Sequence, residues 1–127
     1  MVSKGIEIGL HLSRDLKDEA FVAEALGCLA CFKLSKERGE ELQWQIFRVT
    51  GGSEHHFRLV VRHPSKLIDI SLRKKLEDSM EELSSLSEPQ LADAFNSAVR
   101  EGMKTPPLRE VKEDLDIWND SFWNWFG

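Results

Sequence analysis

Two neighbouring segments, residues 42–50 and 56–63, are rich in aromatic and β-branched residues and flank Gly51-Gly52-Ser53. Side chains of these types are typical of β-strands, and a short glycine-rich connection between two such segments is typical of a hairpin. We therefore expect an antiparallel pair of strands here, and the rest of the fold must be built around it.

The register of this hairpin decides which side chains share a face. With the turn centred near Ser53, residue 49 lies opposite 57, 47 opposite 59, and 45 opposite 61. One face then carries apolar core residues, namely Val49, Phe57, Phe47, Leu59 and Val61. The other face places Trp44 beside Arg62, Ile46 beside Val60, and Arg48 beside Arg58. A slip of one residue would exchange the two faces.

The N-terminal part begins with apolar residues at alternate positions from Ile6 to Leu12, which predicts a strand with one buried face. Ser13 or Asp15 can cap a following helix that runs to about Leu26 and stops at Gly27. Residues 28–35 either extend this helix or form a strand that pairs through the turn-like residues 36–39 with the next segment. We favour the strand.

Helical periodicity dominates after Pro64. Leucine and methionine at helical spacing predict a helix from about Lys66 to Leu86. The sequence from Ser87 to Gln90 matches a capping box and predicts a second helix up to Gly102. Beyond the break at Pro106-Pro107, apolar residues step by three and four along a third predicted helix, namely Leu108, Val111, Leu115, Trp118, Phe122 and Trp125.

These elements predict an α+β fold in which a small, mainly antiparallel βαβββ sheet is followed by three helices. The chain has 127 residues, which fits a single domain over 1–127, sheet-rich in 1–63 and helical in 66–126. The longest apolar run, residues 20–32, is interrupted by Glu24 and is too short to cross a bilayer. No segment has the pattern of a secretory signal. We expect a cytoplasmic protein with no membrane contact.

Charge is distributed unevenly along the chain. Residues 43–75 hold seven Lys or Arg and two Asp or Glu, whereas residues 76–127 hold four Lys or Arg and twelve Asp or Glu. Opposed blocks of this kind either pair within the molecule or present one sign to a partner of the other sign. A third reading is that both are ordinary solvated surfaces.

The C-terminal end combines acidic and aromatic residues. Three of the four tryptophans lie in the last ten residues, among Asp114, Asp116 and Asp120. Large aromatic side chains need cover, so this segment either closes the chain's own basic sheet face or docks on another molecule. The candidate partner-binding residues are Asp114, Asp116, Trp118, Asp120, Phe122 and Trp125.

Two motifs are candidates for chemistry. Cys28 and Cys31 form a C-x-x-C pair, but it follows a helix and lies among apolar residues, which indicates buried core cysteines. His56 with Arg58 or Arg62 could form a small anion-binding cleft, yet no nucleophile or metal-ligand pattern accompanies it. We therefore predict no catalytic residue, no metal site and no cofactor, with an enzyme centred on His56 as one alternative.

The predicted basic face of the hairpin is a second candidate site. Trp44, Arg48, Arg58 and Arg62 would together suit an anion, and arginine beside an aromatic ring suits single-stranded nucleic acid. The acidic net charge of −5 and the single aromatic ring on this face make nucleic acid the less favoured partner.

The interpretation that joins these features is a non-enzymatic, protein-binding factor, in the manner of an immunity protein, inhibitor or chaperone. Its acidic helices from Glu77 to Asp120 would engage a basic partner surface, with the C-terminal aromatic residues as anchors. The partner would be another protein, or a second copy of the chain bound through the C-terminal helix.

Overall fold

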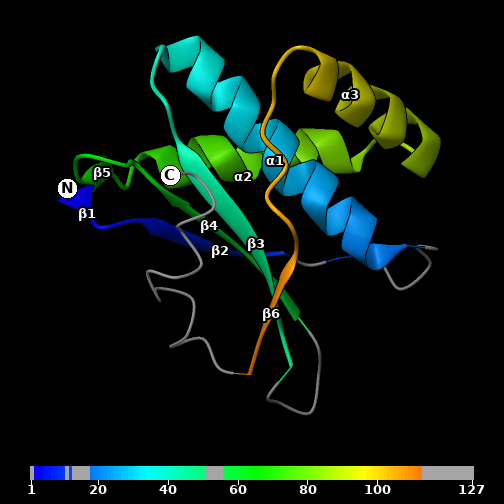
Figure 1. Ribbon diagram of the computed structural model, residues 1–127, viewed down its shortest axis with the longest axis horizontal. Coiled ribbons are helices and arrows are strands. Elements are labelled where there is room, and N and C mark those ends of the chain that lie inside the picture. The colour runs from blue at the N-terminus through cyan, green and yellow to red at the C-terminus, as the bar shows by residue number, and fades with distance from the viewer. Residues whose placement is uncertain (1, 11, 13–17, 51–55, 113–127) are drawn as a thin grey trace.

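The computed structural model describes residues 2–10, 12, 18–50 and 56–112, in which three helices cover one face of a mixed four-stranded sheet (Figure 1). This confirms the predicted α+β class. The elements in chain order are β1 (Val2–Ser3), β2 (Ile6–Leu10), α1 (Glu19–Arg38), β3 (Gln43–Val49), β4 (His56–Arg62), β5 (Ile68–Asp69), α2 (Leu72–Ser84), α3 (Glu88–Arg100) and β6 (Arg109–Val111).

The main sheet has the strand order β2-β4-β3-β6. β2 and β3 each pair antiparallel with β4, and β6 pairs parallel with β3 at one edge. β1 and β5 form a separate two-stranded ribbon. The predicted hairpin and the predicted N-terminal strand are therefore both present, and they form the three adjacent antiparallel strands.

The predicted register of the hairpin is wrong by one residue. Val49 lies opposite His56, Phe47 opposite Arg58, and Trp44 opposite Val61. Since neighbouring side chains along a strand point to opposite faces, this shift exchanges the predicted core residues of β3 between the two faces. Both faces of these strands carry buried apolar residues, so the hydrophobic pattern specifies the register only weakly.

The face of the sheet that the helices cover carries large apolar side chains from three strands. α1 packs across β3 and β4, and α2 packs against β2. The buried sheet residues of this core are Ile6, Ile8, Leu10, Trp44, Ile46, Phe57, Leu59 and Val61. We call this surface the helix face, and the opposite surface the second face.

The strand predicted at residues 28–35 is wrong, because these residues continue α1. The helix begins after Asp18, whose carboxylate accepts the backbone N–H of Phe21 at 3.1 Å, and it ends at Gly39 with φ of 65°. Gly27 is therefore an interior residue of α1 and not its end. α1 packs against the sheet and also against α2 and α3, so its buried residues do not form the single stripe that marks an amphipathic helix.

The C-terminal half differs from the prediction at two points. α2 begins at Leu72, because residues 68 and 69 form β5. The predicted third helix is wrong at its start, since residues 109–111 form β6, and its remainder lies outside the described residues. The capping box is confirmed: Ser87 Oγ accepts the N–H of Gln90 at 3.3 Å, and Gln90 Oε1 accepts the N–H of Ser87 at 2.9 Å.

Candidate functional site

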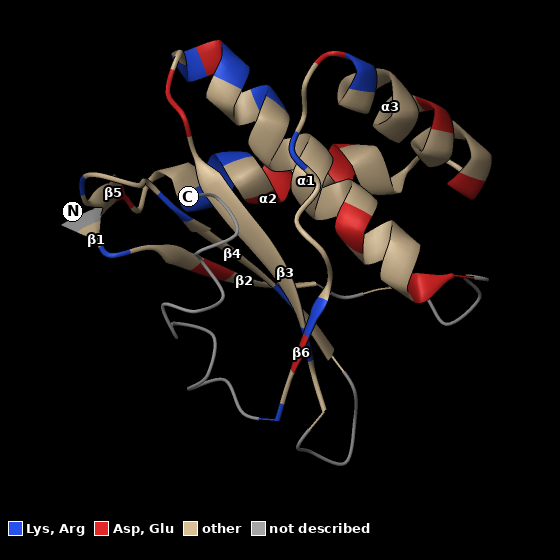
Figure 2. Ribbon diagram, viewed as in Figure 1, with Lys and Arg blue, Asp and Glu red and all other residues tan. Residues whose placement is uncertain are grey.

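α2 and α3 both pack on α1, and acidic residues follow the basic start of α2 and lie along α3 (Figure 2). Between residues 76 and 99 the chain carries six carboxylates and no Lys or Arg. Their buried residues, namely Leu72, Leu76, Met80, Leu91 and Ala98, face the core, so the carboxylates are left on the outer surfaces. This surface corresponds to the described part of the predicted acidic helices.

An open groove lies where α1, α2 and α3 meet. It has a volume of about 590 Å³ and an apolar floor formed by Leu29, Phe32, Leu83, Leu86, Ala94 and Ala98. Phe32, Leu83 and Leu86 are only partly buried against the main core, so part of their apolar surface faces the groove. A cavity of this size and lining can accept several apolar side chains of a partner.

Two ion pairs cross the rim of the groove. Lys33 Nζ lies 3.9 Å from Glu82 Oε2, and Lys36 Nζ lies 3.5 Å from Glu101 Oε2. All four side chains are more than half exposed, so each pair contributes little to stability and can be exchanged for other charged partners. Glu82 and Glu101 are thus the carboxylates nearest the apolar floor.

The structure does not bring the four predicted anion-binding residues together. Trp44 and Arg48 are on the helix face, where Trp44 is buried and the Arg48 guanidinium lies 5.1 Å from the centre of the Phe57 ring. Arg58 and Arg62 are on the second face. Arg62 Nε donates to Gln43 Oε1 at 3.0 Å, so the predicted stacking of Arg62 on Trp44 is wrong.

The second face combines a buried apolar centre with basic residues. Its centre is formed by Phe47, Val49, Val60 and Val111, and the basic groups around it are Arg58, Arg62 and Arg109, with Glu7 of β2 beside Val60. His56 is also on this face, two residues from Arg58. His56 thus shares a face with Arg58 and Arg62, as the enzyme alternative requires, and catalysis stays a prediction.

Cys28 and Cys31 are buried inside α1, which confirms their predicted place in the core. Burial raises the pKa of the Cys28 thiol to about 12, partly offset by a hydrogen bond with Trp44, and burial raises the pKa of Cys31 well above its usual value. Both side chains therefore stay protonated near neutral pH, a state that suits neither attack on a disulfide nor metal ligation. No group of three or more potential metal-ligating side chains occurs in the described ranges.

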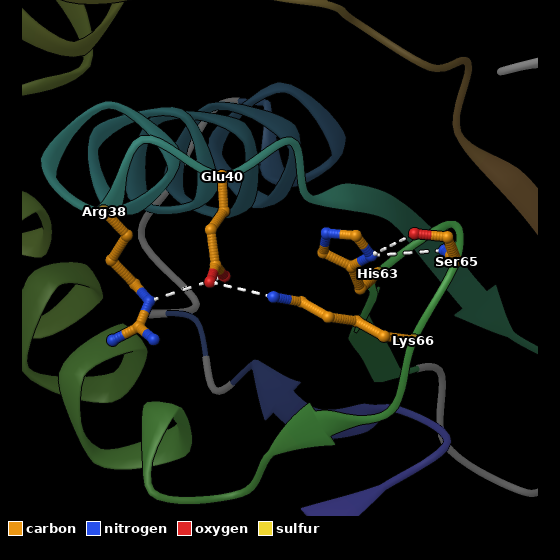
Figure 3. A network of polar contacts seen from close by, with 5 residues as sticks. All are labelled: Arg38, Glu40, His63, Ser65 and Lys66. Atoms are coloured by element: carbon orange, nitrogen blue, oxygen red, sulfur yellow. Dashed lines mark hydrogen bonds and ion pairs between the residues drawn. The ribbon is translucent and has the colours of Figure 1, made fainter.

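Exposed polar contacts connect the segment just after α1 to the turn after β4 (Figure 3). Glu40 Oε1 accepts a hydrogen bond from Lys66 Nζ at 3.1 Å, and Glu40 Oε2 lies 3.6 Å from Arg38 Nε. The hydrogen bond from Lys66 is the main reason why the pKa of the Glu40 carboxyl is lowered. His63 Nδ1 accepts the backbone N–H of Ser65 at 3.2 Å, which gives this histidine a role in the turn.

Glu24 of α1 is half-buried beside the segment that leads into β6. Burial raises the pKa of its carboxyl, while a hydrogen bond from the backbone N–H of Leu108 opposes the rise and the charge of Asp18 adds to it. When folding raises the pKa of a carboxyl group, the free energy of unfolding falls as pH rises from the pKa of the group in the unfolded chain to its pKa in the folded protein.

Replacing Glu24 with glutamine is therefore expected to stabilise the protein at pH 7, because the amide oxygen still accepts the Leu108 N–H and carries no charge. The gain is a fraction of ~1 kcal/mol, since solvent screens a half-exposed carboxylate. Urea unfolding at pH 7 and at pH 4 measures it, and the gain should shrink at pH 4, where the native carboxyl is largely protonated. Glu77→Gln on exposed α2 is the control, and a gain at pH 4 equal to that at pH 7 would contradict the assignment.

The predicted C-terminal partner-binding residues lie outside the described residues. They are Asp114, Asp116, Trp118, Asp120, Phe122 and Trp125. The described chain ends beyond β6, at the edge of the sheet beside β3.

The family profile of DUF2004 matches residues 2–126, which is nearly the whole chain. The chain belongs to the DUF2004 family. The family is described as a protein of unknown function, and its match includes the C-terminal segment after β6 as well as the sheet and helices. No curated protein matches the chain. None of the helices within the described ranges combines the length and apolar character that a bilayer-spanning segment requires.

The groove of this DUF2004 chain was not predicted from the sequence. Its floor comes from three helices, and the sequence signal for it is weak: Ala94 and Ala98 repeat at one-turn spacing on α3, and Leu83 and Leu86 follow the core residues of α2. Such residues look like ordinary core positions along one helix. Only the packing of α2 and α3 on α1 leaves them around an open space.

Proposed function

We propose that this protein is a non-enzymatic, cytoplasmic protein-binding factor whose groove between α1, α2 and α3 receives a basic, amphipathic helix of another protein. The observation that carries the proposal is the open apolar groove of about 590 Å³ set into the acidic α2–α3 surface. Recognition of an amphipathic helix by an apolar groove is a recurrent mode of protein binding. An immunity, inhibitor or chaperone role would each use such a surface.

The chemistry of the partner follows from the surface. Apolar side chains spaced three and four apart on a helix would enter the groove beside Phe32, Leu83 and Leu86. Lysine or arginine on the flanks of that helix would replace Lys33 and Lys36 as partners of Glu82 and Glu101. The acidic field of α2 and α3 would also speed the encounter with a basic partner.

The C-terminal residues predicted to anchor the partner are not used in this proposal. Asp114, Asp116, Trp118, Asp120, Phe122 and Trp125 remain a prediction, because they lie outside the described residues. A nucleic-acid-binding role through Trp44 and the arginines is not proposed, because the sheet separates these side chains onto two faces.

The test uses the full chain and a fluorescent peptide of about 18 residues, built from leucine at helical spacing and lysine elsewhere. A matched peptide with glutamate in place of lysine is the peptide control. Anisotropy titrations should show that the lysine peptide binds and that its binding weakens as salt rises. Equal affinity for the two peptides would contradict the proposal.

Reversing the rim charges with Glu82→Lys and Glu101→Lys together is expected to weaken binding of the lysine peptide by at least ~10-fold, the effect of losing two close charge contacts. The control variant is Glu77→Lys with Glu81→Lys, which makes the same charge change on α2 beside β2 and away from the groove. It should weaken binding by only a few-fold through the long-range field. Equal losses in the two variants would mean that the groove is not the binding site.

A further inference from the structure

β2 is the edge strand of the main sheet on the side away from β6 (Figure 1). Within the described residues it pairs with β4 along one edge, and no strand pairs with its other edge. We call this second edge the outer edge of β2. The backbone groups along an edge of this kind can pair with a strand from another chain.

The hydrogen-bond pattern of the sheet shows which residues of β2 point to the outer edge. The backbone N–H of Thr50 donates to the backbone oxygen of Val111 at 2.9 Å, so even-numbered residues of β3 face β6 and odd-numbered ones face β4. By the same alternation, even-numbered residues of β4 face β3 and odd-numbered ones face β2. The even-numbered residues of β2 lie opposite these and face β4. The backbone N–H and C=O groups of Glu7 and Gly9 therefore point outward.

Two observations agree with this direction. The guanidinium of Arg73, in the first turn of α2, donates to the backbone oxygen of Glu7. Gly9 is exposed and lines a hollow of about 350 Å³ between β2 and α2. A strand from another chain can therefore reach the outer edge at Gly9. At Glu7 it would replace an exposed arginine side chain, which is long enough to move aside.

The hollow beside Gly9 has an apolar floor. Ile8 and Leu10 contribute to it from β2, Leu26 from α1 and Met80 from α2. Because side chains along a strand alternate between the two faces, a strand added at the outer edge would place every second side chain on the helix face, over this hollow. Apolar side chains at those positions would be removed from water there.

Opposite charges lie at the two ends of the outer edge. Glu77 and Glu81 of α2 line the hollow at the end near Leu10. At the other end, a second hollow of about 560 Å³ is lined by Ser3, Lys4, Gly5, Glu7 and Arg73. Two of these side chains are cationic and one is anionic. A strand antiparallel to β2 would have its N-terminal end beside the two glutamates and its C-terminal end beside the two cations.

We propose that the outer edge of β2 binds an extended segment of another protein as an additional antiparallel strand. The segment carries Lys or Arg at its N-terminal end, apolar residues at alternate positions, and Asp or Glu at its C-terminal end, where Lys4 and Arg73 meet it. Its backbone takes the place of the Arg73 guanidinium at Glu7. The inference does not rest on the proposed function, because the groove shares no lining residue with the hollow beside Gly9.

The experiment uses the full chain and a fluorescent peptide of about eight residues, the length of a strand that spans both hollows. The peptide begins with lysine, ends with glutamate and alternates valine with threonine between them. The control peptide exchanges the lysine and the glutamate, so its composition and net charge are the same. In anisotropy titrations the first peptide should bind at least ~10-fold more tightly, the effect of two close charge contacts. Equal affinities, or no binding of the first peptide, would overturn the proposal.

Pairing through the backbone is tested by N-methylation of the peptide. Only every second residue of an added antiparallel strand directs its N–H toward the neighbouring strand. Of two peptides methylated at adjacent central residues, one should bind at least ~10-fold more weakly than the parent and the other within a few-fold of it. Equal losses would mean that the peptide does not bind as a strand.

A pair of charge reversals locates the site on the protein. Glu77→Lys with Glu81→Lys should weaken binding of the first peptide at least ~10-fold. The matched control is Glu82→Lys with Glu101→Lys, which makes the same charge change at the groove and should weaken it by only a few-fold. The reverse order of effects would mean that this peptide binds in the groove, and equal effects would mean that neither surface is its site.

Gly9→Pro removes the outward N–H at the centre of the outer edge. Proline is tolerated in an edge strand whose N–H faces away from the sheet, so the variant should fold and bind the first peptide at least ~10-fold more weakly. Circular dichroism and urea unfolding establish that it is folded, and the methylated peptides test the proposal on the wild type if it is not. Unchanged binding by the folded variant would contradict the proposal. A wild-type dimer in sedimentation that Gly9→Pro converts to a monomer would mean that a second copy occupies the edge instead.

Discussion

Truncating Leu76 to alanine is expected to lower the free energy of unfolding by about 2–5 kcal/mol. Leu76 is 0% exposed and lies in the core where α2 packs against α1. The substitution removes buried carbon atoms and leaves a cavity that the surrounding side chains fill only partly. Urea unfolding followed by circular dichroism measures the loss, with the slope of the transition checked for two-state behaviour.

The matched control is the same substitution at Leu67, which is 58% exposed. Leu67→Ala should change the free energy of unfolding by no more than ~0.5 kcal/mol, because it removes little buried surface. Losses of similar size in the two variants would mean that α2 does not contribute Leu76 to the core. The Leu76 variant also bears on the groove, because its floor includes Leu83 and Leu86 from α2 and the loop that follows it.

Replacing Gly27 with valine is expected to lower the free energy of unfolding by about 3 kcal/mol, at the upper end of the usual cost of overpacking. A Cβ atom on Gly27 would lie 2.3 Å from Ile46 Cδ1 and 3.2 Å from Leu59 Cδ1. Both neighbours are fully buried, so they have little room to move. The absence of a side chain at this position is what lets α1 lie this close to β3 and β4.

A double-mutant cycle identifies this contact as the cause. Gly27→Ala should cost less than valine, because alanine recovers ~1 kcal/mol of helix propensity. Ile46→Val removes the Cδ1 atom that a Cβ would meet first and alone costs about 0.5–1.5 kcal/mol. The double variant should lose less than the sum of the single losses. Strict additivity would show that the two positions do not compete for the same space.

The sequence predicted an element correctly where the residues that stabilise it lie close together in the chain. The capping box at Ser87 was predicted and is present, because its two hydrogen bonds join residues three apart in the chain. The strand at Ile6–Leu10 was predicted from alternation, and its apolar residues are buried on one face. The hairpin segments were predicted from composition in the same way.

The errors occurred where the outcome depends on distant neighbours. Residues 28–35 form helix because the middle of α1 packs against the sheet, α2 and α3, which makes the continuously apolar stretch at residues 25–32 favourable in a helix. Residues 109–111 form β6 because β3 offers an open edge, and backbone hydrogen bonding to that edge outweighs the local helical spacing. The predicted anion site is not formed, because the observed register differs by one residue and places Trp44 and Arg62 on opposite faces of the sheet.

The sequence by itself determined the α+β class, the hairpin, the buried cysteines and the acidic character of α2 and α3, because periodicity, capping and charge are properties of short segments. Only the tertiary structure decided the hairpin register, the continuous α1 and the groove between the helices. Those features depend on which surfaces meet across the core, and residues far apart in the chain compete for those contacts.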